Sequence, residues 1–553
     1  MSSHSDSSRT IAMRRRDFVA GSLAAGTALV SGSRAWAQGG ATVPLHCVPP
    51  IPPGQASLFA PSPGSVRVRK SVFDLDKPEV KRLQDAYAAL RKLATDHPDD
   101  PRGWLHQGQV HCWYCTGALD SLNGMEIHGS WWFLAWHRCY LYFHERILGE
   151  LIGDPTFALA YWDWDSCKDD PKDKTGRNRF PGEVFGFSGD TSNPLFDPTR
   201  AVGPNDRIDT AFVGPTTMKP IMDAKSFAEF GGSGNEELPV FDQSGGGVQQ
   251  MGSLEAGPHG LVHVWTTDPK GFSGAPDMGS LASAGFDPVF FAHHANIDRL
   301  WDKWAQAPGH ANPNNPRWLN IDRSQQPPQL TPLFFFYDQS PTWLAILVDQ
   351  VTDPGGPLSY RYQQPQWPSG SAAPAGAAVT AAAEAPRGAP RMAQIAPLSA
   401  PVVELTQGPE LKVLPPEPTT VRLALPAAAR QNLTAAAASA AAKALVLRID
   451  GVEVPSDRGA VIKVYLNRPD VTAALEGPQP GYVGSMIIVP STAPGALHAH
   501  GSVVRNFGLP LTPELAASLQ NQGDISVTLV PVTGETNKPP EVLRYRRVYL
   551  ATR

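Results

Sequence analysis

The sequence predicts a mainly α-helical domain with long loops, followed by a small antiparallel β domain. Helical periodicity is concentrated before residue 363, whereas short runs rich in Val, Ile and Leu recur within residues 401–553. Between them, residues 364–400 are rich in Ala, Pro, Gly and Ser with little periodicity, which is typical of a linker. At 553 residues the chain is long enough for two or three units.

Four helices are expected in the first domain, residues 40–363. Asp76 can cap a helix that follows it. A second helix, at about residues 130–151, is aromatic on nearly all sides and should be deeply buried. Shorter helices are expected near residues 255–265 and 287–306. Long Gly-, Pro- and Asp-rich loops separate them, and loops over a helical scaffold often build active sites.

Five segments beyond the linker are predicted to be strands. Each is a short run of Val, Ile, Leu or Tyr bounded by turn residues, which favours an antiparallel arrangement. They are residues 445–449, 461–466, 485–489, 525–530 and 542–550.

Composition limits the classes of partner. A hydrophobic fraction of 42% is enough for a sizeable core. The net charge of −5 leaves no basic surface typical of nucleic-acid binding. We therefore expect no nucleic-acid partner, and the substrate has to be argued from the site. No membrane partner is expected, and a homo-oligomer is compatible with the sequence.

The first 37 residues have the pattern of an export signal. Arginines at positions 14–16 precede Phe18 and an apolar run to Val30, and Ala35 and Ala37 form an A-x-A cleavage pattern. The arginines favour the twin-arginine route, with an ordinary secretory signal as the alternative. The apolar run is short for a bilayer span. The mature protein is therefore expected to be exported, either periplasmic or secreted.

The chain has five cysteines, so at least one lies outside any disulfide. Cys112 and Cys115 form a C-x-x-C pair, but no second pair follows at the spacing of a zinc site. Cys139 and Cys167 match no motif and are expected to be buried structural thiols.

The histidines gather in two clusters, which we take as candidate metal ligands. The clusters are His111, His128 and His137, and then His259, His263 and the pair His293–His294. His259 and His263 are four residues apart, so both can face one ion from a single helix. No Glu follows His259, so the H-E-x-x-H zinc protease motif is absent from this sequence. Imidazole ligands suit copper, zinc, iron and nickel, so a three-histidine zinc hydrolase is an alternative.

Long motifs surround these histidines. They are H-C-W-Y-C at 111–115, W-H-R-C-Y-L-Y-F-H-E-R-I-L at 136–148 and D-P-V-F-F-A-H-H-A-N-I-D-R-L-W at 287–301. They resemble the two copper-binding regions of tyrosinases and polyphenol oxidases, with the plant catechol oxidases nearest. The resemblance implies two copper ions as cofactors, dioxygen as co-substrate and a four-helix bundle around the metals. It puts copper A on His111, His128 and His137, and copper B on His259, His263 and His294.

The resemblance also implies roles for neighbouring residues. Cys115 matches a cysteine that forms a thioether with a copper A histidine, here His128. Cys112 is then available to bridge Cys47. His293 is expected beside the copper B ligands rather than among them.

Three further residues are expected close to the metals. By resemblance, Asp298 orients a ligand, Phe290 puts a ring beside the copper pair, and Glu255 holds a water molecule. A plainer interpretation of Glu255 is an acid favoured at a helix N-terminus.

The activity implied is oxidation of small phenolic substrates, from o-diphenols to o-quinones. Gly260 and Val264 follow the first two copper B histidines, where strong monophenol hydroxylases often carry Asn after the first, so weaker hydroxylation is expected. Leu281 replaces a Phe gate, which predicts tolerance of bulky phenols. The alternatives are a full tyrosinase with strong monophenolase activity, an o-aminophenol oxidase and an oxygen carrier similar to hemocyanin.

A weaker resemblance continues through L-F-F-F-Y-D at 333–338 and Y-R-Y at 360–362 into the β domain. It implies that residues 401–553 shield the active-site mouth and keep the enzyme latent until the linker is cut. The alternative is a domain that only stabilises the fold or an oligomer.

Overall fold

The computed structural model describes most of the chain in ranges separated by gaps. The described residues are 33–35, 42–44, 56–61, 64–115, 127–187, 189–233, 251–272, 276–365, 403–404, 413–425, 445–454, 459–472, 476–490, 503–519, 522–532 and 542–552. Nearly all of the predicted export signal and linker therefore lies outside them. Within these ranges, no helix combines the length and apolar character needed to cross a membrane.

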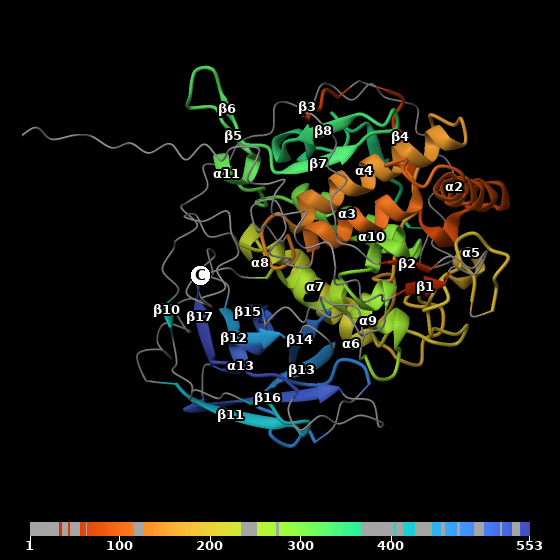
Figure 1. Cartoon of the computed structure of the whole chain (residues 1–553). Coiled ribbons are helices and arrows are strands. Elements are labelled where there is room, and N and C mark those ends of the chain that lie inside the picture. The colour runs from red at the N-terminus through yellow and green to blue at the C-terminus, as the bar shows by residue number, and fades with distance from the viewer. Residues whose placement is uncertain are drawn as a thin grey trace, which may run out of the picture. The chain divides into compact units, whose positions relative to one another are not determined.

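Helices dominate the first two thirds of the chain (Figure 1). The longer ones are α2 (Lys77–Asp96), α3 (Trp104–Cys115), α4 (Phe133–Leu151), α9 (Gly260–Thr267) and α10 (Val289–Ala305), and a π-helical turn, η2 (Glu255–His259), runs directly into α9. The predicted cap of α2 is confirmed. Asp76 Oδ1 accepts a hydrogen bond from Glu79 N (2.8 Å), and Glu79 Oε2 accepts one from Asp76 N (3.0 Å).

Short helices of three to nine residues lie within the loops. They are η1 (Val72–Asp74), α5 (Gly182–Phe185), α6 (Thr210–Val213), α7 (Pro215–Asp223), α8 (Phe227–Phe230), η3 (Asp277–Gly279), η4 (Ala284–Phe286), α11 (Pro316–Leu319), η5 (Val348–Val351) and α13 (Pro513–Ser518). The sequence did not predict α5 to α8, because helices of four to nine residues are too short to show a period of 3.6.

Small sheets border the helices. β3 (Ser57–Leu58) runs parallel to β8 (Trp343–Ile346), which pairs antiparallel with β7 (Phe334–Tyr337). β4 (Arg67–Arg69) runs parallel to β9 (Tyr360–Tyr362), and β5 (Ile321–Asp322) pairs with β6 (Gln329–Leu330). β1 (Ser33–Ala35) and β2 (Thr42–Pro44) pair antiparallel within a separate unit, residues 1–45 with 495–497.

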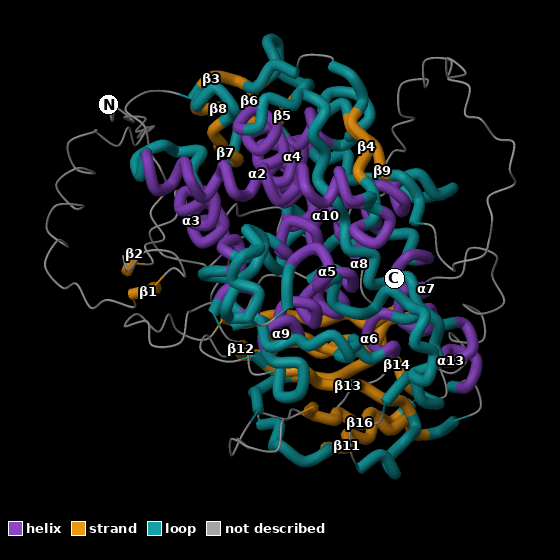
Figure 2. The backbone as a smooth tube through the Cα atoms, turned by 90° about the vertical axis from the view of Figure 1, so that its right-hand side faces the viewer, coloured by secondary structure: helices purple, strands orange, loops and turns teal. Residues whose placement is uncertain are grey.

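Two antiparallel four-stranded sheets follow residue 403 (Figure 2). One has the order β10 (Val403–Glu404), β17 (Arg547–Thr552), β12 (Leu445–Val454), β15 (Val503–Pro510); the other has the order β11 (Thr419–Ala424), β16 (Asp524–Val532), β13 (Ala460–Leu466), β14 (Tyr482–Ile488). Leu447 of the first sheet and Ile462 of the second belong to one buried core, so the sheets pack face to face. The sequence did not predict β15, because Arg505, Asn506 and Gly508 interrupt its apolar pattern.

The helical region and the C-terminal sheets belong to one compact unit, residues 46–494 with 498–553. Met251 N donates a hydrogen bond to Asn506 O in β15 (3.2 Å), and Leu281 N donates one to Pro490 O after β14 (2.8 Å). Lys463 of β13 is buried, with its Nζ 2.7 Å from Asp209 Oδ2. Backbone and charged side chains therefore both join the sheets to the helical region.

Asp298 of α10 is the acceptor at the centre of a buried clamp. Its Oδ1 accepts from Arg138 Nε of α4 (2.5 Å). Its Oδ2 accepts from Arg69 Nη1 of β4 (3.3 Å) and from the hydroxyls of Tyr360 (2.5 Å) and Tyr362 (2.6 Å) in β9. One carboxylate therefore fixes α10 against α4 and the β4–β9 pair.

Asp298→Ala should lower the free energy of unfolding by about 3–5 kcal/mol, because it removes the carboxylate from two buried guanidinium groups. Urea unfolding followed by circular dichroism measures the change. Asp85→Ala is the matched control, since Asp85 pairs with Lys81 on the exposed face of α2 and its loss should cost at most about 0.5 kcal/mol. Equal losses in the two variants would contradict the assignment of the clamp.

Candidate metal centre

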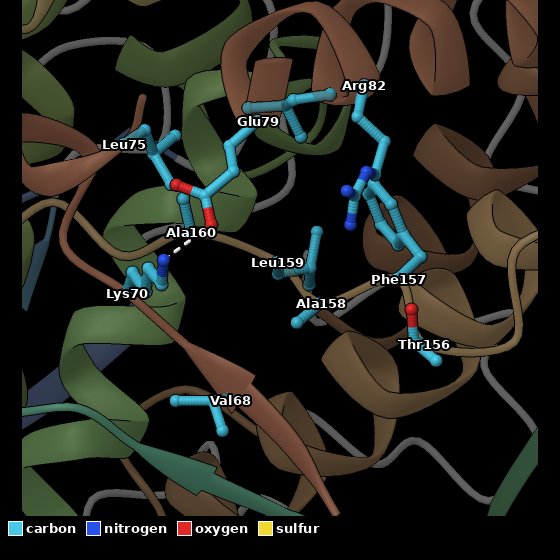
Figure 3. A pocket seen from close by; sticks show the side chains of 11 residues that line it. Val68, Lys70, Leu75, Glu79, Arg82, Thr156, Phe157, Ala158, Leu159 and Ala160 are labelled. Carbon is cyan, nitrogen blue, oxygen red and sulfur yellow. Dashed lines mark hydrogen bonds and ion pairs between the residues drawn. The ribbon is translucent and has the colours of Figure 1, made fainter. Parts of the chain in front are cut away.

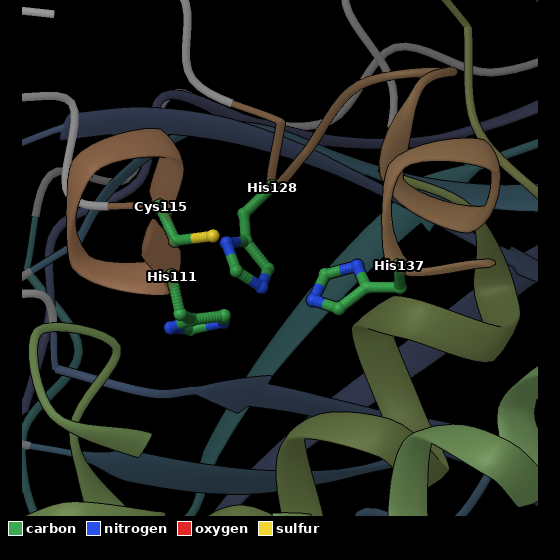
Figure 4. Close-up of side chains that lie close together, drawn as sticks. All are labelled: His111, Cys115, His128 and His137. Carbon is green, nitrogen blue, oxygen red and sulfur yellow. The ribbon is translucent and has the colours of Figure 1, made fainter. Parts of the chain in front are cut away.

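Two groups of histidines come together in the core. The first joins His111 and Cys115 of α3, His128 before α4 and His137 of α4; the second joins His259 of η2, His263 of α9, and His293 and His294 of α10. Within each group, one candidate ligand atom per residue lies within 4.8 Å of the others. All six predicted ligands are at most 2% exposed. Figure 4 shows the first group, with the Cys115 sulfur directed towards His128.

Backbone carbonyls orient three of the ligand rings. The Nδ1 atoms of His111, His137 and His263 lie 2.9, 2.8 and 2.8 Å from the carbonyl oxygens of Leu281, Phe133 and Met278, respectively. A carbonyl oxygen can only accept, so each Nδ1 carries the proton and each Nε2 keeps its lone pair. These lone pairs are available for a metal ion.

The Nε2 atoms of the second group converge on one point. His263 Nε2 lies 3.1 Å from His259 Nε2 and 3.3 Å from His294 Nε2. Two imidazole nitrogens on one tetrahedral ion, each about 2.0–2.1 Å from it, are about 3.3 Å apart. The three nitrogens are thus spaced as ligands of one ion, and imidazole ligands suit copper.

The two groups touch. The rings of His137 and His294 stack with their centroids 4.0 Å apart and their planes at 9°. The ring of Phe290 lies 4.7 Å from that of His111 and 4.1 Å from that of His294, which puts it beside both groups. Ions held by the two groups would therefore be close neighbours.

The π-helical turn η2 presents His259. Pro258 lies within it and has no N–H to donate, and Gly260 N donates instead to Glu255 O, five residues back. Turns of this kind are frequent at functional sites. The sequence predicted a helix here but not its wider turn.

Burial lowers the pKa of every predicted ligand. Loss of solvation is the largest cause for all six histidines, and it lowers the pKa of His137 to about 3 and that of His263 to about 4. The rings are therefore neutral at pH 7, which is the form that binds a metal.

A cavity opens beside the two groups, between the helical region and the C-terminal sheets. Its lining residues are His128, Met251, Glu255, His259, Gly260, Leu281, Ile487, Ile488, Val489, Arg505 and Phe507. Glu255 is 1% exposed, and its Oε1 accepts a hydrogen bond from Gly129 N (2.7 Å). A Cβ on Gly260 would come within 3.1 Å of Ile487 Cγ2, so the sheet fills the space that a side chain at position 260 would need.

Other predicted residues take positions that the sequence did not specify. Val264 is buried beside Gly459 at the start of β13, and it is not among the described residues that line the cavity. The Asp298 carboxylate bonds arginines and tyrosines, and none of its described hydrogen bonds reaches a histidine. Asp298 therefore acts on the candidate ligands through the position of α10.

Cys112 is disulfide-bonded, whereas Cys47, its predicted partner, lies outside the described residues.

Figure 3 shows a second cavity, and no histidine is among the residues that line it. Its lining residues are Val68, Lys70, Leu75, Glu79, Arg82, Leu83, Thr156, Phe157, Ala158, Leu159 and Ala160. Lys70 Nζ and Glu79 Oε1 form an ion pair there (2.5 Å). None of the predicted site residues lines it, so we assign it no part in the chemistry.

Comparison with known proteins agrees with this geometry. The common central domain of tyrosinase matches residues 100–307, which include all six predicted ligands. Catechol oxidase B of Solanum tuberosum is 33% identical over 324 residues, which cover 54% of this chain and 50% of that protein. The polyphenol oxidase of Malus domestica is 29% identical over 517 residues, which cover 89% and 79% of the two chains. The alignments with the first curated relatives span about half the length of those proteins.

Solved structures resemble most of the chain. A latent aurone synthase, a polyphenol oxidase, has a TM-score of 0.67 at 26% identity, covering 93% of this chain and 95% of that one. A latent apple tyrosinase has a TM-score of 0.63 at 26% identity, covering 90% and 99%. The fold and the paired histidine groups thus define a dinuclear copper protein of the type 3 class. Within that class, the chain belongs to the tyrosinase and polyphenol oxidase family.

The metal-free protein should lose stability as the pH falls below about 6.5, the pKa of histidine in an unfolded chain. The unfolded state then takes up protons that the buried rings do not bind, because burial lowers their pKa, to about 4 in the case of His263. The loss of stability therefore grows as the pH falls from 6.5 towards 4. Urea midpoints from pH 7.5 to 5 measure it. His263→Phe should flatten the pH dependence, whereas His97→Gln, at an exposed histidine, should leave it unchanged. A midpoint independent of pH would contradict burial of neutral rings.

Proposed function

We propose that this protein oxidises o-diphenols to o-quinones with dioxygen, using one copper ion at each histidine group. The stacking of His137 on His294 carries the proposal, because it supports two ions close enough to act on the same small molecule. A copper pair bound there would supply the two-electron oxygen chemistry. Two diphenols give four electrons and four protons to one dioxygen, which leaves as two water molecules. The names of the catechol oxidase and polyphenol oxidase relatives support this reaction class.

Glu255 is our candidate for handling the proton of the phenol. It supplies a buried carboxylate to the cavity, one oxygen of which is held by Gly129 N. Gly260, its neighbour in the cavity, has no side chain to help hold a water molecule, and Val264 is apolar. We therefore propose diphenol oxidation as the main activity and monophenol hydroxylation as a weaker one.

Leu281 is our candidate for the entrance residue, since its side chain lines the cavity. Its carbonyl also orients His111, and a substitution of the side chain leaves that contact in place. An aliphatic side chain at this position should admit bulkier phenols than an aromatic side chain would.

We also propose a thioether between the sulfur of Cys115 and a ring carbon of His128. The S–H and C–H hydrogens would leave as two protons and two electrons, which dioxygen would take up, so the intact protein would be lighter by two hydrogen atoms.

Dioxygen uptake by the copper-loaded protein tests the reaction. We expect uptake with 4-methylcatechol, a much slower rate with p-cresol, and loss of both in His263→Phe. His310→Gln is the control, since His310 lies outside both histidine groups. Comparable turnover of p-cresol and 4-methylcatechol would overturn the diphenol preference. No uptake with two coppers bound would point to an oxygen carrier.

We further propose that the C-terminal sheets act as a shield that keeps the protein latent. Five residues of β14, β15 and the segment after β14 line the cavity beside the predicted ligands: Ile487, Ile488, Val489, Arg505 and Phe507. The pair Lys463–Asp209 and the hydrogen bond from Leu281 N to Pro490 O support a closed position. The similar solved structures include proteins described as latent.

Cleavage within residues 364–400, followed by removal of the C-terminal fragment, should raise catechol uptake severalfold because the cavity opens. Intact mass would verify the cut, and uptake before and after would measure the effect. Protein cut but not separated from its fragment is the control, since the buried contacts should hold the shield in place. Unchanged uptake after the fragment is removed would leave the sheets a stabilising role only.

Export through the twin-arginine route remains our proposal for localisation. It rests on the arginines at 14–16 and the A-x-A pattern before Gln38. The relatives from Solanum tuberosum and Malus domestica are described as chloroplastic, and we do not extend that location to this chain.

A further inference from the structure

His293 is a fourth buried imidazole at the second histidine group, and the copper assignment does not use it. One of its ring nitrogens lies within 4.8 Å of a nitrogen of each of the other three histidines. Its ring is parallel to that of His259 within 17°, with 5.3 Å between centroids, and meets His263 edge-on at 5.0 Å. By position alone, His293 could complete a set of four nitrogen ligands.

Trp164 determines which nitrogen of His293 carries the proton. The indole Nε1 of Trp164 lies 3.1 Å from His293 Nδ1. An indole N–H can only donate, so Nδ1 is the acceptor and its lone pair is directed at Trp164. The proton of the ring is then on Nε2, where it blocks the second lone pair. Neither nitrogen is left to bind a metal.

The segment that carries Trp164 is fastened to α10, which carries His293. Trp162 N donates to Ala292 O (3.0 Å). Asp165 Oδ1 accepts from Asn296 Nδ2 (2.9 Å) and from Arg299 Nη2 (2.6 Å). Trp164 itself is fully buried. The indole is therefore held in register with His293 by contacts on both sides of it in the sequence.

We propose that Trp164 is a positioning residue that keeps His293 out of the coordination of the second metal ion. Three protein ligands leave a position open for a small molecule, as in catalytic sites, whereas a fourth imidazole would close the site. The inference rests on the proposed copper pair but not on the identity of the phenol.

Trp164→Phe tests the proposal, because it removes the donor and keeps an aromatic ring. The proton of His293 can then move to Nδ1, which makes Nε2 a fourth ligand. Zinc is the probe, since it accepts the same ligands. We expect the zinc-loaded variant to release the ion of the second group to a chelator at least about tenfold more slowly. Its crystal structure should have a His293 nitrogen about 2.0–2.1 Å from that ion.

The controls separate ligand exchange from a general loss of packing, which would speed release instead. Trp162→Phe is the matched control, because it removes a buried indole from the same segment whose Nε1 donates to Arg179 O (3.0 Å) and not to a histidine. Zinc release from this variant should match the wild-type rate. The double variant Trp164→Phe with His293→Phe should also return to the wild-type rate, because the new ligand is gone. Release from Trp164→Phe at or above the wild-type rate, with three histidine nitrogens on the ion, would overturn the proposal.

His293→Phe alone provides an independent measurement should Trp164→Phe fail to fold. A residue that is not a ligand can be replaced without loss of metal, so this variant should retain two zinc ions per chain. Retention of only one would overturn the proposal. Zinc does not consume dioxygen, so these outcomes do not depend on whether the copper-loaded protein oxidises catechol.

Discussion

The burial of neutral imidazoles in one core is the constraint on which the rest of the structure depends. A buried ring needs a partner for the nitrogen that does not face the metal. Here Phe133, Met278 and Leu281 supply backbone carbonyls for three of the rings. The short turns around Met278 and Leu281 therefore have to stay packed against α3 and α9. The Asp298 clamp acts differently, because it bonds arginines and tyrosines and fixes the position of α10, which carries His294.

The candidate ligands could be named from the sequence because most of them lie in long motifs that resemble the copper-binding regions of a known family. The four-residue spacing of His259 and His263 alone was compatible with several metals. The sequence could not predict the carbonyls that orient the ligands, since every residue has one and its direction is a property of the backbone. The role expected for Asp298 also differs from the contacts that its carboxylate makes in the structure. The resemblance implied that Asp298 orients a ligand, whereas its carboxylate accepts charge-assisted hydrogen bonds from buried Arg69 and Arg138.

In the C-terminal region, apolar runs predicted β12, β13, β14, β16 and most of β17, whereas β10, β11 and β15 were not predicted. Of the three residues that interrupt the apolar pattern of β15, Arg505 is the one that lines the cavity. Arg505 breaks the apolar pattern because it lines the cavity beside His128, and Phe507 lines it too. The local pattern of apolar residues predicts a strand well where the strand packs only within its own domain. Where a strand contacts a distant part of the chain, those contacts decide its residues and the pattern is lost.

Gly260 connects two properties that could otherwise vary independently. The side chain that position 260 lacks is one that would approach the substrate, and its space is filled by Ile487 from the C-terminal sheet. An evolving lineage that acquired a polar residue at 260 would have to reshape position 487 as well. If the proposed function holds, the range of phenols that the site accepts and the packing of the C-terminal sheet both depend on the Cα atom of Gly260, so homologues should change positions 260 and 487 together.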